Sequence, residues 1–136
     1  MPDDQLQPAP ASVAGGRLRK APENCLDAAG VRTVLDVGGG HGQLAGPLAR
    51  SGYEVTVLGS AASCARRVQH LVDARQCTFV QGDVVNLPFP DRSFDAVISV
   101  RLVMHCDEWP DLIAELCRVA RRTVVVDYPL AGGVQA

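Results

Sequence analysis

Five short apolar runs alternate with segments of helical periodicity, and this alternation constrains the fold more than any other feature of the sequence. The runs are TVLDV (33–37), YEVTVL (53–58), CTFVQ (77–81), FDAVISV (94–100) and TVVVDY (123–128). Apolar residues recur at helical spacing between them, which predicts helices over 42–51, 61–73 and 109–120. Strands that alternate with helices form parallel sheets through right-handed crossovers. The sequence therefore predicts an α/β fold with a doubly wound, mostly parallel sheet of five strands.

The length and composition of the chain indicate one domain of ordinary size. Its 136 residues are 47% hydrophobic, which is enough to build one core. Residues 1–18 are rich in Pro, Ala, Gly and Gln and are predicted to be a disordered tail. Residues 19–136 are then expected to form a single domain.

Charge and cysteine usage argue against several classes of function. The formal net charge of −2 gives no electrostatic case for binding nucleic acid. No apolar run approaches the ~20 residues of a membrane span, and the first residues lack the apolar segment of a secretory signal. The five cysteines contain no C-x-x-C pair, so no metal site is expected. These features predict a cytoplasmic protein.

Four glycines fall within five positions directly after the first apolar run, in the stretch TVLDVGGGHGQLAGPLARSG (33–52). Glycine loses more backbone entropy on folding than any other residue, so such a cluster needs a physical reason. A tight turn would need only one glycine, whereas a ligand that lies against the main chain needs several positions without a Cβ atom. In doubly wound sheets, ligands bind beyond the carboxyl ends of the strands, where the strand order reverses. The cluster therefore predicts a ligand site at the end of the first strand.

Two stretches resemble the motifs of a known enzyme superfamily. LDVGGGHG resembles the first motif of the class I S-adenosylmethionine-dependent methyltransferases, an acidic residue followed by G-x-G-x-G. VQGDVVNLPFPDRSFDAVIS is similar to the second and third blocks of that superfamily, in the methyltransferase type 11 branch that includes the ubiquinone/menaquinone methyltransferases. The resemblance covers about residues 31–128. It implies a Rossmann-like sheet with strand order 3-2-1-4-5, S-adenosyl-L-methionine as cofactor, and a small-molecule methyl acceptor.

The resemblance also implies which residues hold the amino acid end of the cofactor. Gly38, Gly40 and Gly42 would cradle the amino acid and ribose portion. Asp36, near the end of the first strand, would lie near the cationic amino group, directly or through water. Methyl transfer is a direct displacement, so positioning of the two reactants provides most of the catalysis.

A second group of residues matches further contacts with the cofactor, two of them at its adenine end. Asp83 matches the position that accepts a hydrogen bond from the adenine amino group, and the Val84 N–H would face the ring edge. Ser99, near the end of the fourth strand, matches a residue that touches the cofactor, and the alternative is a buried serine bonded to the backbone. Asp95, at the other end of that strand, and Asp91, in a turn, are interpreted as structural.

The sequence departs from the family pattern at the end of the second strand, in YEVTVLGSAAS (53–63). The resemblance implies an acidic residue that holds the ribose hydroxyls, but this position is Gly59. Glu54 begins the strand and is too far away. Ser60 could bond to the cofactor, although an N-cap of the next helix is the favoured interpretation. Loss of a charged hydrogen-bond partner costs about 1.5–3 kcal/mol, so weaker cofactor binding is expected.

A second departure is that the sequence stops soon after the fifth strand, in VVVDYPLAGGVQA (124–136). The resemblance implies seven strands, with the last two beside the fifth. The fifth strand is therefore expected to be an exposed apolar edge, which invites pairing with another chain. A dimer, a partner chain that covers this edge, or a fragment of a longer protein would each account for it.

The residues after the fourth strand are the candidates for contact with the acceptor. His105 is a candidate general base, because its unperturbed pKa lies near 6.5, and the alternative is a loop histidine. Arg101 could pair with an acidic substrate or with the cofactor carboxylate. Trp109 is expected to pack at the start of a helix, whereas Asp127 and Tyr128 lie at the end of the fifth strand, beside the predicted pocket.

Two other functions remain open from the sequence. The segment 40–45 also fits the G-x-G-x-x-A pattern of an NADP-binding oxidoreductase, although that pattern does not explain Asp36 or the second block. The absence of an acid at Gly59 and of the last strands would also fit a methyltransferase fold that serves as a non-catalytic subunit. Cofactor binding, followed by turnover, distinguishes these functions.

Overall fold

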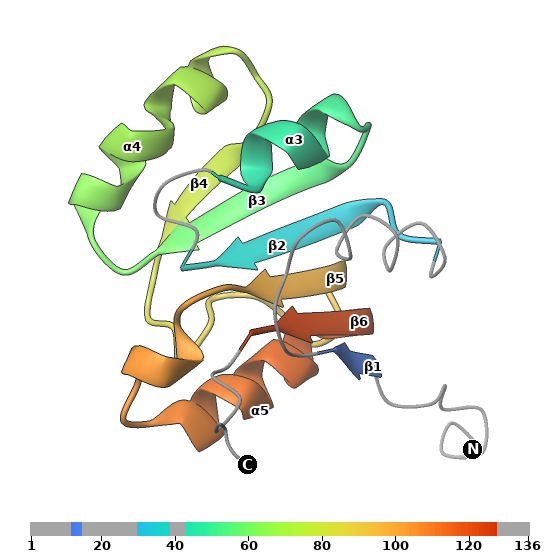
Figure 1. Cartoon of the computed structure of the whole chain (residues 1–136), viewed down its shortest axis with the longest axis vertical. Helices are drawn as coiled ribbons and strands as arrows, with labels where there is room; N and C mark the ends of the chain where they lie inside the picture. The colour runs from blue at the N-terminus through green and yellow to red at the C-terminus, as the bar shows by residue number, and fades with distance from the viewer. Residues whose placement is uncertain (1–11, 15–29, 39–42, 128–136) are drawn as a thin grey trace.

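The computed structural model describes residues 12–14, 30–38 and 43–127, which form one parallel sheet with helices on both faces (Figure 1). The strands are β1 (Ser12–Ala14), β2 (Thr33–Val37), β3 (Glu54–Gly59), β4 (Thr78–Gln81), β5 (Phe94–Ser99) and β6 (Ala120–Val126). Their order across the sheet is β1-β6-β5-β2-β3-β4, and every pairing between them is parallel. The series β4-β3-β2-β5-β6 is the predicted order 3-2-1-4-5, so the expected doubly wound, Rossmann-like α/β fold is confirmed.

Helices cover the two faces of the sheet. α3 (Ala45–Arg50) and α4 (Ala62–Asp73) pack on one face, and α5 (Trp109–Val119) packs on the other. A 3-10 turn, η1 (Val103–His105), connects β5 to α5. α3 begins later than the sequence predicts, so Pro47 lies in its first turn, where the missing N–H breaks no helical hydrogen bond.

The two faces of the sheet are buried in two separate hydrophobic cores. One core joins Val34, Val57 and Ile98 of the sheet to Leu48 of α3 and Val68 of α4. The other joins Leu35, Val97 and Val124 of the sheet to Leu112 and Leu116 of α5. Alternate residues of a strand point to opposite faces, so Asp36 lies on the same face as Val34, beneath α3 and α4.

The outer edge of β6 is covered by the chain itself. Ser12–Ala14 pairs in parallel with residues 123–125 of β6. The expectation of an exposed fifth-strand edge is therefore wrong, and this edge no longer argues for a dimer or a partner chain. The prediction of disorder is wrong for 12–14, whereas the rest of 1–18 lies outside the described residues. A three-residue strand is too short to show a period in the sequence, although a free edge readily pairs with an extended segment.

Asp95 joins the amino ends of β5 and β2, as its structural interpretation predicts. Its carboxylate accepts hydrogen bonds from the N–H groups of Arg32 at 2.9 Å and Thr33 at 3.2 Å, and from Arg121 at 2.9 Å. Its own N–H donates to the Thr33 hydroxyl at 2.9 Å. Burial raises the pKa of this carboxyl, but the two N–H donors and the charges of Arg121 and Arg122 bring it below its ordinary value.

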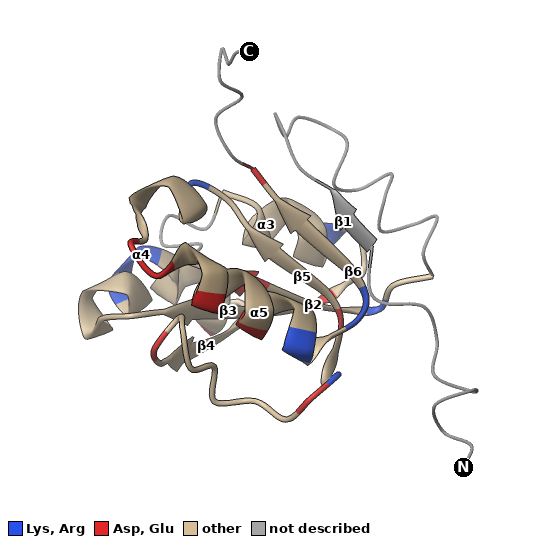
Figure 2. Cartoon of the chain, turned by 90° about the horizontal axis from the view of Figure 1, so that it is seen from below, with Lys and Arg blue, Asp and Glu red and all other residues tan. Residues whose placement is uncertain are grey.

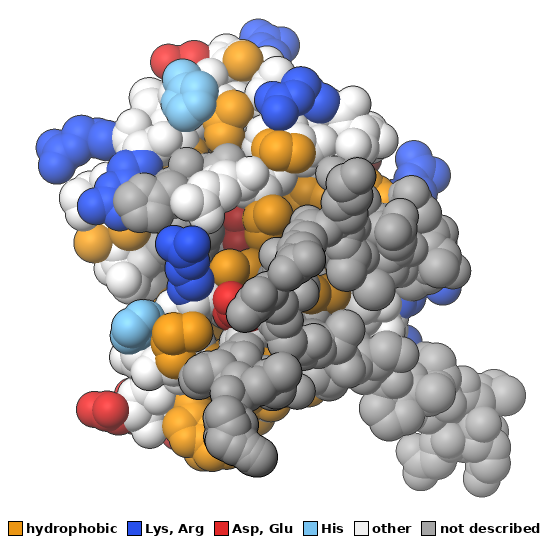
Figure 3. All heavy atoms as spheres, viewed as in Figure 1, with side chains coloured by type: hydrophobic (Ala, Val, Ile, Leu, Met, Phe, Trp, Pro, Cys, Tyr) orange, Lys and Arg blue, Asp and Glu red, His pale blue; other side chains and the backbone are white. Residues whose placement is uncertain are grey.

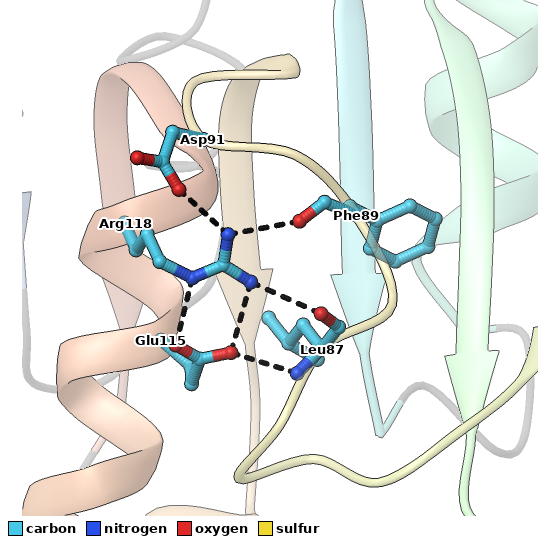
Figure 4. A network of polar contacts seen from close by, with 5 residues as sticks. All are labelled: Leu87, Phe89, Asp91, Glu115 and Arg118. Atoms are coloured by element: carbon cyan, nitrogen blue, oxygen red, sulfur yellow. Dashed lines mark hydrogen bonds and ion pairs between the residues drawn. The ribbon is translucent and has the colours of Figure 1, made fainter.

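Arg118 ties the loop before β5 to α5 (Figure 4). Its guanidinium donates to the carbonyl oxygens of Leu87 at 3.0 Å and Phe89 at 2.9 Å, and pairs with Asp91 at 2.8 Å. Glu115 also pairs with Arg118 at 2.8 Å and accepts from the Leu87 N–H at 2.8 Å, and the bond from Arg118 lowers the pKa of Glu115. The turn residue Asp91 therefore has a structural partner, within a surface that carries both signs of charge along α5 (Figure 2).

Candidate functional site

A pocket of about 380 Å³ lies at the carboxyl ends of β2, β3 and β5. β2 is the strand at which the order reverses, since β3 follows it on one side and β5 lies on the other. The pocket therefore lies at the switch point where doubly wound sheets bind their ligands. Its lining residues are Asp36, Gly38, Gln43, Leu44, Gly59, Ser60, Cys64, Arg67, Val84, Val100, Arg101, Leu102 and His105.

Asp36 has a buried carboxyl group that no described residue satisfies. Only 1% of the residue is exposed, and neither carboxyl oxygen has a hydrogen-bond partner within the described parts of the chain. Burial raises the pKa of Asp36 to about 7. A buried polar group without a partner is costly, so native proteins rarely keep one without a ligand, a water or a catalytic role. Asp36 is therefore suited to a cationic donor that enters the pocket.

Gly38 directly follows β2, in a conformation that glycine adopts without strain. Its φ is +78°, and its N–H donates to the Leu58 carbonyl oxygen at 2.8 Å. A Cβ atom at this position would lie 3.1 Å from Cδ2 of Leu102, so a side chain would also crowd the pocket wall. Gly40 and Gly42, the other two glycines of the predicted cradle, lie outside the described residues.

The position of the expected ribose-binding acid is closed by packing. A Cβ atom on Gly59 would lie 2.7 Å from Cβ of Cys64 and 3.1 Å from Cε1 of Phe79. An acidic side chain there would require α4 and β4 to shift. The glycine is thus matched to its neighbours, and the pocket has no carboxylate at the end of β3.

Ser60 and Arg67 line the pocket beside this gap. The interpretation of Ser60 as an N-cap is wrong, because the N-cap of α4 is Ala61 and it makes no side-chain capping bond. Ala61 already has the extended backbone of a cap residue, and Ser60 lies one position too early. The exposed Ser60 hydroxyl is therefore left on the pocket side.

The other predicted cofactor-binding residues, Asp83, Val84 and Ser99, differ in their positions. Val84 lines the pocket, but Asp83 does not, and its carboxylate accepts a hydrogen bond from the Val85 N–H at 2.9 Å. β4 ends at Gln81, so Asp83 belongs to the turn after the strand. Ser99 is fully buried behind the pocket wall. Its hydroxyl has no partner among the described residues, so the alternative of a serine bonded to backbone is not observed.

Arg101 and His105, from the segment after β5, both line the pocket. Arg101 has a φ of 63°, which is uncommon for a residue with a side chain, and its N–H donates to Asp127 at 2.6 Å. Asp127 is not among the lining residues of the pocket, whereas Tyr128 lies outside the described residues. Trp109 is the first residue of α5, as expected, but 53% of it is exposed, so its side chain packs against the fold only in part.

Sequence reasoning missed several residues of the pocket lining, among them Cys64 and Leu102. Cys64 lies in the first turn of α4, where it fills the space beside Gly59. Leu102 lies against Gly38. The sequence carried a signal for both, since a glycine at a strand end often faces a neighbour that approaches closely.

Residues 12–14, 30–38 and 43–127 lack two features, a metal-binding cluster and a membrane-spanning helix. They contain no cluster of His, Cys, Asp and Glu that could hold a metal ion. None of their helices is both long and apolar enough to cross a bilayer. Four cysteines in these ranges, Cys64, Cys77, Cys106 and Cys117, are free thiols.

Comparison with known proteins identifies one family. Residues 35–126 match the family model described as a methyltransferase domain. The chain is 39% identical over 96 residues to the fatty-acid O-methyltransferase of Mycolicibacterium smegmatis, a match that covers 66% of this chain and 34% of that protein. It is 33% identical over 97 residues to the malonyl-[acyl-carrier protein] O-methyltransferase of Pectobacterium atrosepticum, with 70% and 37% covered. The chain thus spans only about a third of the length of these relatives.

Solved structures share the same fold. A structure from Methanococcus maripaludis has a TM-score of 0.69 at 23% identity, covering 79% of this chain and 53% of that one. A methyltransferase from Aquifex aeolicus, described as dependent on S-adenosylmethionine, has a TM-score of 0.65 at 22% identity, with 79% and 63% covered. At these identities the likeness establishes the fold alone.

Proposed function

Because the chain belongs to the methyltransferase-domain family of class I S-adenosylmethionine-dependent methyltransferases, we propose that it binds S-adenosylmethionine in this pocket and transfers its methyl group to a small-molecule acceptor. The observation that carries the proposal is the buried Asp36 carboxyl without a partner among the described residues. The family's cofactor has a cationic amino group, which is the donor that such a carboxylate needs. The residues present therefore fit the cofactor.

The neighbours of Asp36 complete the binding site in this proposal. Gly38 leaves the backbone open to the cofactor's amino acid portion, with Gly40 and Gly42 in the same role. Asp83 and Val84 are assigned to the adenine side, and Ser99 to a contact with the cofactor at the end of β5. Ser60 takes the ribose hydroxyls, since no side chain fits at Gly59.

The absence of a ribose-binding carboxylate at Gly59 has an energetic consequence. A hydrogen bond to a charged group contributes about 1.5–3 kcal/mol, which corresponds to roughly one to two decades of affinity. A serine hydroxyl supplies a neutral bond of smaller value. Cofactor affinity is therefore expected to be lower than in a site with an acid at this position.

The chain's residues act by position rather than by covalent chemistry. When bound, S-adenosylmethionine would supply an electrophilic methyl group, which passes directly to the acceptor with the thioether as leaving group. Asp36 and Gly38 fix one end of the cofactor, and the rim residues Arg101 and His105 face the acceptor side. Such fixed geometry provides most of the rate gain in a direct displacement. In this proposal His105 accepts a proton from an acceptor that loses one.

Isothermal titration calorimetry of the purified chain with S-adenosylmethionine and S-adenosylhomocysteine tests the proposal. Both ligands should bind, and Asp36→Asn should weaken S-adenosylmethionine by about ten- to a hundredfold, since it removes the charged acceptor. Glu54→Gln is the matched control, because this exposed acid at the other end of β3 lies outside the pocket. Absence of binding to the folded chain would contradict the proposal, and binding of NADPH instead would favour the oxidoreductase alternative.

A further inference from the structure

An apolar groove lies beside the cofactor pocket. It is lined by Val103, Met104, Cys106, Trp109, Ile113 and Val126, together with Asp107. Within the described ranges, the exposed large hydrophobic side chains are Met104 at 45% and Trp109 at 53%, and both belong to this groove. Single exposed hydrophobics are normal, but exposed ones that gather in one depression mark a binding surface.

The turn η1 is a wall shared by the groove and the pocket. Leu102 and His105 line the pocket, whereas Val103, Met104 and Cys106 line the groove. Figure 3 shows a histidine and hydrophobic side chains side by side on this face. A ligand that reaches the pocket rim can therefore extend along the groove without crossing the sheet.

Two basic side chains, Arg101 and His105, line the pocket next to the wall that it shares with the groove. Arg101 is exposed there. Its backbone N–H donates to the Asp127 carboxylate at 2.6 Å, and its φ is positive, which is uncommon for a residue with a side chain. Backbone conformations of this kind cluster at binding sites, where the surrounding structure holds a side chain in place. The described lining of the pocket has one carboxyl group, Asp36, which is buried at its floor. Asp107 lines the groove and would repel a second carboxylate. An anionic group of a ligand is therefore favoured beside Arg101 and His105 rather than farther along the groove.

We propose that the methyl acceptor is a carboxylic acid with an apolar chain, whose carboxylate binds at Arg101 beside His105 and whose chain lies along Met104 and Trp109. The inference rests on the proposed function. A carboxylate oxygen attacks the methyl carbon, the O–C bond forms as the S–C bond breaks, and the electron pair of that bond stays on sulfur. The products are a methyl ester and S-adenosylhomocysteine. A carboxylate has no proton to lose, so His105 holds the anion and is not needed as a base.

Trp109 is the one tryptophan of the chain, so its fluorescence reports directly on the groove. The 136-residue chain is titrated with decanoate below its micelle concentration, with and without S-adenosylhomocysteine. Decan-1-ol has the same chain without the charge, and acetate has the charge without the chain. Decanoate should shift Trp109 emission saturably to shorter wavelength, decan-1-ol should bind about tenfold more weakly, and acetate should leave the emission unchanged.

Variants at two arginines separate the charge from the fold. Arg101→Asn removes the guanidinium while asparagine still adopts a positive φ, and it should weaken decanoate about tenfold without changing decan-1-ol. Arg75→Asn is the matched control, since Arg75 is also exposed with a φ of 59° but lies before β4, away from the pocket. Arg101→Lys should recover most of the affinity for decanoate. Met104→Gln should weaken both decyl ligands.

Each outcome decides the proposal. Equal affinity for decanoate and decan-1-ol, or equal effects of the Arg101 and Arg75 variants, would overturn it. Trp109 emission that no ligand shifts would also overturn it, and would indicate that another segment of the protein or a second copy fills the groove. The calorimetric titration with S-adenosylmethionine is scored separately. Cofactor binding without acid binding refutes only this inference, whereas acid binding without cofactor binding refutes the proposed function.

Discussion

Two buried aspartates on neighbouring strands meet opposite surroundings at opposite ends of the sheet. Asp95, at the amino end of β5, accepts two backbone N–H bonds and pairs with Arg121. Asp36, near the carboxyl end of β2, has no partner among the described residues. The pKa of Asp95 lies below its ordinary value, whereas burial raises that of Asp36 to about 7.

This difference in hydrogen-bond partners distinguishes a carboxylate that stabilises the fold from one that binds a ligand. A buried carboxylate with partners recovers its lost hydration and stabilises the fold. A buried carboxylate without partners costs stability, so the fold tolerates it where a ligand will supply the missing donor. The two residues should therefore respond in opposite ways to pH, to substitution and to the cofactor.

The largest effect should be the pH dependence of stability caused by Asp36. Its folded-state pKa of about 7 lies above the ordinary value of 3.8, so its neutral form is favoured on folding. This stabilisation is complete below the unfolded pKa and is lost as pH rises through 7, a change of about 4 kcal/mol in the free energy of unfolding. Urea unfolding between pH 4 and pH 8 measures it, and Asp36→Asn should remove it. If the free energy of unfolding depended on pH equally in Asp36→Asn and in the parent chain, Asp36 would not differ from Asp95 in the way proposed.

Asp95→Ala should destabilise the chain by about 3 kcal/mol at pH 7. The change leaves the N–H groups of Arg32 and Thr33, and the side chain of Arg121, without their acceptor. Urea unfolding measures the loss, with Asp111→Ala on the exposed side of α5 as the control. Asp36→Asn should have the opposite sign under the same conditions. Equal losses at both positions would show that the two acids do not differ in role.

Arg118→Met should cost about 2 kcal/mol of stability while leaving the cofactor's dissociation constant unchanged. It removes the hydrogen bonds to Leu87, Phe89 and Asp91 but leaves the pocket lining intact. Denaturation and calorimetry on the same sample test both parts. A large loss of cofactor affinity in the folded variant would show that the loop before β5 contributes to cofactor binding and not to stability alone.

Cofactor affinity should fall about tenfold for each pH unit below 7, because protonation of Asp36 removes the negative charge that attracts the cofactor's amino group. Above pH 7 the affinity should level off. Calorimetry from pH 5.5 to pH 8 follows the dependence, and Asp36→Asn should flatten it. A pH-independent affinity in the parent chain would contradict the assignment of Asp36.

The smallest effect should come from Ser60→Ala. A neutral hydrogen bond contributes about 0.5–1.5 kcal/mol, so S-adenosylmethionine should bind roughly three- to tenfold more weakly. Stability should not change, because the Ser60 side chain does not cap α4. A loss of stability with unchanged binding would return Ser60 to the role of a helix cap.

Much of the fold could be predicted from the sequence because its parallel strands are buried on both faces. Such strands read as continuous apolar runs, and the glycines after β2 indicated the strand end at which the pocket lies. β1 could not be found this way, since three residues carry no period. The sequence predicts that the next helix begins at residue 42, whereas α3 begins at Ala45. Helix boundaries depend on capping rather than on periodicity, so this later start could not be predicted.

The candidate site could be predicted only in part. Asp36, Gly38, Ser60, Val84, Arg101 and His105 all line the pocket, but their partners depend on contacts between distant segments. The clash at Gly59 requires Cys64 from the next helix, and the conformation of Arg101 requires Asp127, directly after β6. The exposure of the Trp109 side chain also could not be predicted from its position at the start of α5.

The central claim is that the Asp36 carboxyl is reserved for the cofactor's amino group. The most direct test follows the carboxyl carbon of Asp36 by NMR through a pH titration, with and without saturating S-adenosylhomocysteine. The pKa should be about 7 in the free chain and should fall by about 2 pH units when the ligand is bound, because an opposite charge then lies beside it. A pKa that stays near 7 in the saturated chain would contradict the claim.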